Sequence, residues 1–284
     1  MKRLPLPQFD ATEAVQTCAS GITIEERAQA LLAALPVIRK TETAYRELAP
    51  AGKLYEMEAT DVVTSELDGT LMGVIYKSHF ARNNSPSRLL YEQIKMAPEF
   101  GICPLCGQRI VATVDHYLPQ SLYPALNLTP VNLVPACSDC NKRKLAGVAA
   151  RAEDQTLHPY YDDLGTERWL IAKIIPSSPP AVAFTIRPPA VWSEVLTARA
   201  NHHFEVLGLP ELYAAQAASE MADISYSLEE LGEATGPTGI GQHLDQQFRT
   251  RFWRDRNSWR TALYEGLRDS EWFCNEGYRQ IRPR

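Results

Sequence analysis

Apolar residues at helical spacing run through most of the first hundred residues. IEERAQALLAALPVIRKTETAYRELA repeats apolar side chains every three to four positions, which predicts an amphipathic helix. Thr23 and Glu26 stand in the register of a capping box, so we expect the helix to begin there. Pro36 breaks or kinks it, and a second helix follows through Tyr45 and Leu48.

A further helix is predicted at SPSRLLYEQIKMA. Ser85 can cap it, and Pro86 takes the first helical position, where a missing backbone N–H costs nothing. These helices predict a helical N-terminal region over residues 1–98.

The pattern beyond residue 148 is first β-prone and then helical. WLIAKIIP and AVAFTIRP, separated by SSPP, predict a short antiparallel pair. After Pro189, helical spacing returns in VWSEVLTARANHHFEVLGL, in PELYAAQAASEMADISYSLEEL and in a segment through RNSWRTALYEGL. GEATGPTGIG, between the last two, is predicted to be a loop.

The centre of the chain predicts two strands and a helix. IVATVDHYLP indicates a strand that ends in Asp115 and His116, NLVPA a second strand that opens with Asn132, and NKRKLAG a helix. The predicted fold class is therefore α+β, a mostly helical protein with a central module. We divide it into a helical region 1–98, the module 99–147, and a mostly helical region 148–284 with the short β pair.

Length and composition allow well-buried cores and give no sign of export. The 284 residues, 45% of them hydrophobic and 22% charged, suffice for one large or two ordinary domains. No run of eighteen apolar residues occurs, and MKRLPLPQFDATEAV has no apolar segment behind its charges. We expect neither a membrane span nor a signal peptide, and a cytoplasmic protein.

The charge is distributed unevenly. A net charge of −5 taken alone argues against a nucleic-acid partner. Residues 71–150, however, carry eight basic and four acidic side chains, and residues 249–284 carry nine and five. This pattern is typical of a polyanion-binding face on an otherwise acidic protein, although either segment singly is also explained by scattered, solvated arginines.

Four of the six cysteines form two Cys-x-x-Cys pairs about thirty residues apart, Cys103 with Cys106 and Cys137 with Cys140. In a reducing compartment this spacing favours metal over disulfides. Four thiolates predict a structural Zn²⁺ that is coordinatively saturated, so catalysis has to come from other residues.

Polar residues enclosed by these pairs have the chemistry of phosphodiester hydrolysis. His116 can take a proton from water near neutral pH, and we expect the amide carbonyl of Asn132 to fix its other ring nitrogen. Asp115 and Asn141 offer hard oxygens to a catalytic Mg²⁺ or Mn²⁺. Each residue alone has an ordinary structural explanation, so a zinc module without catalysis is the alternative.

These residues together resemble the HNH nuclease family. The matching features are Cys-Pro-Leu-Cys, Asp115-His116, Asn132, and Cys137-Ser-Asp-Cys140 followed by Asn141, over residues 100 to 144. The chain is similar to the variant with Asn as the last letter and, in its zinc clamp, to the phage endonuclease VII group. The resemblance implies a ββα-metal fold and the same assignment of roles. The final Asn suits Mg²⁺ better than soft metals.

A looser resemblance lies outside the module. LHPYYDDL, NHHFEVLGL and NSWRTALYEGLRDSEWFCNEGY are similar to bacterial HNH proteins that accompany an ATPase in anti-phage defence, including the Septu type and its retron-linked relatives. It implies an ATPase partner that restrains or targets the nuclease.

Basic residues near the module are candidates for contact with a nucleic-acid backbone. We name Arg109 and the run Lys142, Arg143 and Lys144, with a solvated helix face as the alternative for the run. The expected function is a metal-dependent endonuclease that cuts DNA with low sequence specificity. The alternatives are a non-catalytic zinc adaptor and a ribonuclease or tRNA nuclease that uses the same site.

Overall fold

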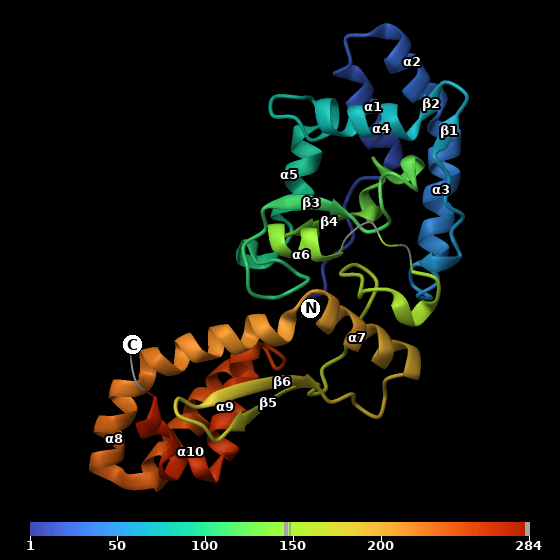
Figure 1. Ribbon diagram of the computed structural model, residues 1–284. Coiled ribbons are helices and arrows are strands. Elements are labelled where there is room, and N and C mark those ends of the chain that lie inside the picture. The colour runs from blue at the N-terminus through green and yellow to red at the C-terminus, as the bar shows by residue number, and fades with distance from the viewer. Residues whose placement is uncertain (145–146, 148, 282–284) are drawn as a thin grey trace. The chain divides into compact units, whose positions relative to one another are not determined.

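The chain folds into two compact units, Met1–Asp163 and Leu164–Arg284. Figure 1 shows the computed structural model, which describes residues 1–144, 147 and 149–281. Within these residues, helices predominate and the strands form two-stranded antiparallel sheets, so the α+β, mostly helical prediction is confirmed. Contacts group the predicted regions 1–98 and 99–147 in one unit, and the three-part division remains a prediction from sequence.

The first unit contains six helices and two small sheets among the described residues (Figure 1). Its helices are α1 (Ala11–Ser20), α2 (Glu25–Ala33), α3 (Leu35–Leu48), α4 (Gly69–Ile75), α5 (Arg88–Met96) and α6 (Ser138–Lys144). Its strands are β1 (Val62–Thr64), β2 (Leu67–Asp68), β3 (Thr113–His116) and β4 (Leu133–Ala136). A π-helical turn, η2 (Tyr76–Phe80), continues α4, and a 3-10 turn, η5 (Pro130–Asn132), precedes β4.

Two helices start later than predicted. The break near Pro36 is confirmed, and the proline lies in the first turn of α3. The capping box at Thr23 was wrong, because α2 begins at Glu25 with no side-chain cap bond. The Ser85 hydroxyl donates to the Arg82 carbonyl in the preceding turn, so α5 begins at Arg88, later than predicted.

The predicted elements of the module are found with small shifts. Asn132 belongs to η5, one residue before β4, because its backbone closes a 3-10 turn rather than opening the strand. Helix α6 begins at Ser138, earlier than the predicted Asn141. Leu145 and Ala146, near the end of the predicted helix, and Val148, at the predicted boundary, lie outside the described residues.

The hairpin of β3 and β4 is part of the N-terminal core. Val114 and Leu133 are buried in the same cluster as Met72 and Ile75 of α4 and Phe80 of η2. Burial of side chains of this size stabilises the contact by about 1.5–3 kcal/mol each. The core therefore fixes α4 and η2 against the hairpin that carries Asp115 and His116.

The second unit pairs a hairpin with helices (Figure 1). Its elements are β5 (Leu170–Ile175), β6 (Ala181–Ile186), α7 (Glu194–Val206), α8 (Leu209–Arg254), α9 (Trp259–Asp269) and α10 (Glu271–Asn275). The predicted antiparallel pair is confirmed, with Leu170 opposite Ile186. Helix α9 packs against β5, and α8 packs against β6.

The predicted loop GEATGPTGIG lies inside α8 and was wrong as a loop. The helix is interrupted at Gly236, whose backbone has φ +65° and ψ −166°. A glycine adopts this conformation readily because it has no Cβ, and Pro237 continues the chain as the first residue of a new helical segment. The glycine- and proline-rich composition of this segment had predicted a loop. The structure has a helix break at a single glycine, Gly236, in its place.

No helix among the described residues combines the length and the apolar character that crossing a membrane requires.

Candidate active site

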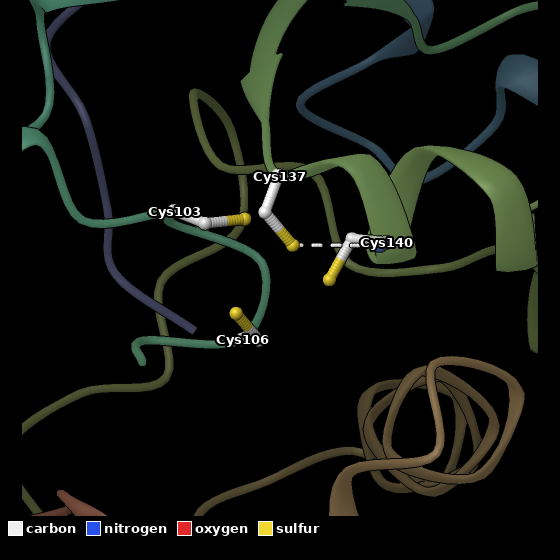
Figure 2. A group of neighbouring side chains, drawn as sticks. All are labelled: Cys103, Cys106, Cys137 and Cys140. Carbon is white, nitrogen blue, oxygen red and sulfur yellow. Dashed lines mark hydrogen bonds between the residues drawn. The ribbon is translucent and has the colours of Figure 1, made fainter. Parts of the chain in front are cut away.

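The two Cys-x-x-Cys pairs meet at one point. Their Sγ atoms all lie within 4.8 Å of one another, and all four residues are buried. Figure 2 shows the sulfurs of Cys103 and Cys106 facing those of Cys137, directly after β4, and Cys140, in α6. A tetrahedral zinc with arms of about 2.3 Å has sulfur–sulfur edges of about 3.8 Å. The cluster therefore fits the predicted zinc.

Backbone donors support thiolates in this cluster. The Arg109 N–H donates to Cys106 Sγ and the Cys140 N–H donates to Cys137 Sγ, each at 3.4 Å. Interaction among the four thiols lowers the pKa of Cys106 to about 7 and that of Cys137 well below its usual range, and it raises the pKa values of Cys103 and Cys140. N–H donors stabilise the charged form of sulfur, which is the form that binds metal.

Arg109 has a structural partner that the sequence did not predict. Its Nε lies 2.9 Å from Asp139 Oδ2, so the ion pair joins the first cysteine pair to α6. Its predicted contact with nucleic acid stays a prediction.

The hairpin and α6 bring three of the four predicted catalytic residues to one cavity. Asp115 and His116 end β3, where His116 pairs with Leu133 of β4, and Asn141 lies one residue after Cys140 in α6. All three line a cavity of about 600 Å³. Only Cys137 separates the end of β4 from the start of α6, so the chain itself places the amide near the strand, and the cysteine cluster joins the Cys103–Cys106 turn to both.

The His116 ring is buried and held on two sides. The side chain is 5% exposed, its Nε2 lies 3.1 Å from the Asn127 carbonyl oxygen, and Tyr76 packs edge-on against it at 4.5 Å between ring centres. A carbonyl oxygen only accepts, so Nε2 carries the proton and Nδ1 is left as the acceptor. Burial lowers the pKa of His116 to about 4, which keeps the ring neutral near pH 7.

The partner predicted for His116 was wrong. The Asn132 amide bonds the backbone instead: its Oδ1 accepts from the Leu118 N–H at 2.7 Å and its Nδ2 donates to the Leu118 carbonyl at 3.1 Å. The buried amide thus satisfies the backbone of the loop that joins β3 and β4. The ring is instead oriented by a main-chain carbonyl, that of Asn127, which leaves no signature in the sequence.

Asp115 already has a cationic partner. Lys144 Nζ lies 2.9 Å from Asp115 Oδ2, with both side chains largely buried, and it also donates to the His116 carbonyl. The Asp115 Oδ1 accepts from the His116 N–H. The Asp115 carboxylate is largely buried and lines the cavity together with the Asn141 amide. A buried carboxylate favours a positive charge beside it, and the Lys144 ammonium occupies that place. The residues therefore fit a divalent cation that takes the place of the ammonium.

The other predicted basic residues are placed differently. Lys142 and Arg143 are exposed on α6 and are absent from the cavity lining, whereas Lys144 lines it. A further wall of the cavity comes from α4 and η2, through Gly69, Thr70, Gly73, Val74 and Lys77. Sequence reasoning missed this wall, because its residues precede the module and match no motif.

A hairpin, a helix, a four-cysteine cluster and an Asp-His pair in this arrangement form an HNH endonuclease domain, and the family model of the HNH endonuclease matches residues 103–147. The chain is therefore a nuclease, a hydrolase of phosphodiester bonds.

Two relatives are similar to this chain. Protein ea31 of Escherichia phage lambda is 28% identical over 293 aligned positions, which cover 96% of this chain and 99% of the relative. The Septu protein PtuB of Bacillus thuringiensis is 28% identical over 111 positions, which cover 30% of this chain and 42% of the relative. No solved structure is a significant match.

Proposed function

We propose that this nuclease is a metal-dependent endonuclease that hydrolyses phosphodiester bonds in DNA with low sequence specificity, as the effector of an anti-phage defence system. The observation that carries the chemistry is the single cavity lined by Asp115, His116 and Asn141. It offers a base for the attacking water and two hard oxygen ligands for a cation that would bind the phosphate.

His116 acts as the general base. Its Nδ1 takes a proton from a water molecule, the water oxygen forms a bond to phosphorus, and the P–O bond to the leaving group breaks. The leaving oxygen takes a proton from solvent. The Asn127 carbonyl and the Tyr76 ring hold the imidazole in place, so little reorganisation accompanies the transfer.

Asp115 and Asn141 would hold the catalytic Mg²⁺ or Mn²⁺. The cation would neutralise charge on the phosphate and on the leaving oxygen. A carboxylate and an amide oxygen are hard ligands, and they leave positions for water and phosphate.

DNA is the proposed substrate, read mainly through its backbone. Lys142 and Arg143 are exposed on the helix that also carries Asn141, where they can contact phosphates flanking the cleavage site. Such contacts position the strand without reading bases, which supports low sequence specificity.

The similarity to PtuB supports the defence setting. We include in the proposal an ATPase partner that restrains or targets the nuclease, and a cytoplasmic location.

Cleavage of a supercoiled plasmid in Mg²⁺ or Mn²⁺ tests the proposal. His116→Ala should lose at least about 100-fold in rate, because general-base catalysis contributes on that order or more. His202→Ala, a partly exposed histidine on α7, is the matched control and should cut like the parent. If His116→Ala cuts as fast as the parent, the proposed mechanism is wrong. If the parent cuts an RNA of the same sequence faster than the DNA, RNA is the substrate instead of DNA.

A further inference from the structure

One wall of the cavity belongs to no part of the HNH domain. It is made by α4 and η2, which lie before the matched residues 103–147. This wall lines the same cavity as Asp115 and His116, so a strand whose phosphate reaches the base also meets α4 and η2.

Tyr76 fixes η2 to the catalytic strand. Its ring packs against His116, and its hydroxyl donates to the Val114 carbonyl at 3.3 Å. Tyr76 is buried, and Ile75 and Phe80 are fully buried beside it. The backbone of the next residue, Lys77, is therefore held in a defined position relative to the imidazole, and its side chain is exposed.

Lys77 is an ammonium without an ionic partner among the described residues. Several other basic side chains of the first unit are paired, including Lys144 with Asp115 and Arg88 with Glu92. The segment Gly69–Phe80 contains no acidic residue. The cavity lining therefore carries two ammonium groups, those of Lys77 and Lys144, against one carboxylate, that of Asp115.

The same wall has room and a polar group without a partner. A Cβ at Gly73 would meet only Gln120 Oε1, at 3.9 Å, so the missing side chain leaves space in the cavity. The Gln120 Oε1 atom is buried and has no hydrogen-bond partner among the described residues. The O and N of an amide exchange by a flip, so this position can equally present an N–H donor.

We propose that Lys77, with Gln120 beside Gly73, binds a phosphate of the nucleic-acid strand next to the phosphate that is cleaved. The wall is a backbone-binding subsite that holds the strand across from Asp115 and His116. This inference rests on the proposed function for the identity of the ligand, and the two are tested by different readouts.

The test measures binding and cleavage separately. Binding of short fluorescein-labelled DNA, single-stranded and duplex, is measured over a salt series in a His116→Ala background without divalent metal. Adding Lys77→Ala should weaken binding about ten-fold and reduce the slope of log affinity against log salt by about 1, because one phosphate contact is lost. Lys77→Arg should retain most of the affinity.

Arg82→Ala is the matched control, since Arg82 is exposed, has the same charge and lies outside the cavity lining. Its affinity and salt slope should equal those of the background. With His116 restored, Lys77→Ala should raise KM for the plasmid more than it lowers kcat, as expected for a group that binds substrate and transition state alike.

The outcomes separate the two proposals. Lys77→Ala that binds like Arg82→Ala, or a parent that binds none of the probes, overturns the subsite. Binding that depends on Lys77 while His116→Ala still cuts like the parent supports the subsite and rejects the proposed catalytic mechanism.

Discussion

At the residue scale, Asn132 and Asn141 both belong to the predicted motif but differ in their surroundings. Asn132 is fully buried and both ends of its amide bond the backbone of Leu118. Asn141 is partly exposed and lines the cavity. The first amide bonds the backbone of the loop after His116, and the second is available to a ligand in the cavity.

Replacement of each asparagine by alanine should separate these roles. Asn132→Ala leaves a buried N–H and a buried carbonyl unpaired, so we expect the free energy of unfolding to fall by about 2–4 kcal/mol. Asn141→Ala should change it by less than about 0.5 kcal/mol and still lose cleavage. Urea denaturation and plasmid cleavage of both variants check this, and equal stability losses would contradict it.

Lys144 competes with any cation for Asp115. Because its ammonium lies 2.9 Å from the carboxylate, a divalent ion has to displace it. Lys144→Met should therefore bind Mn²⁺ more tightly than the parent, by about ten-fold, without nucleic acid present. Calorimetric titration measures this, with Lys142→Met, exposed on the same helix, as the control. Unchanged Mn²⁺ affinity in Lys144→Met would show that the ion pair does not oppose metal binding.

At the scale of elements, the cysteine cluster joins the strand and the helix that carry the site. Cys137 directly follows β4 and Cys140 lies in α6, while Cys103 and Cys106 belong to the turn that precedes β3. A zinc bound there ties three segments of the first unit together, and such sites contribute on the order of 10 kcal/mol to folding.

Loss of one thiolate should unfold this region. Cys137→Ser is expected to lose zinc and much of the thermal stability of the first unit, whereas Cys274→Ala, in the second unit, should keep one zinc per chain. Metal analysis and circular dichroism during heating provide the measurement. A Cys137→Ser protein with the melting temperature of the parent would contradict a structural metal.

The break in α8 depends on one glycine. The backbone of Gly236 lies in a region that is essentially limited to glycine, and a Cβ there would meet nothing within 4 Å. Gly236→Ala should therefore cost about 1–3 kcal/mol through the backbone alone. Gly241→Ala, inside the helix and equally open, should stabilise by about 0.5–1 kcal/mol. Opposite shifts of the two melting temperatures are expected, and shifts of the same sign would refute the explanation.

Elements that depend on neighbouring residues in the sequence could be predicted, whereas features that depend on contacts between distant residues could not. The strands, the hairpin pair and the cysteine cluster were predictable because alternation, turn residues and ligand spacing are local signals. The helical passage through Gly236 was not, since glycine and proline mark a loop and a helix break alike. The Asn127 carbonyl and the Lys77 wall depend on tertiary packing, which a single sequence does not encode in a motif.

At the scale of the whole molecule, the site and its support lie in one unit. The cavity, the cysteine cluster and the N-terminal core all fall within Met1–Asp163. The second unit has a core of its own, with Phe184, Tyr213 and Leu263 buried. Each unit thus has the buried apolar surface that independent folding requires.

A fragment of residues 1–163 should therefore fold, bind zinc and cut DNA without the second unit. Circular dichroism, metal analysis and plasmid cleavage of the fragment test this, with Cys137→Ser in the same fragment as the unfolded reference. An insoluble or zinc-free fragment would show that the first unit depends on the second.

The edge-on contact between Tyr76 and His116 means that the HNH segment cannot be moved into another protein by itself with its site intact. A chimera that contained only residues 103–147 would have every residue of the HNH motif. It would lack Tyr76, whose ring packs against the imidazole of His116. Transfer of the activity to another protein would therefore require α4 and η2 as well. The structural unit that supports catalysis is larger than the segment that the family motif covers.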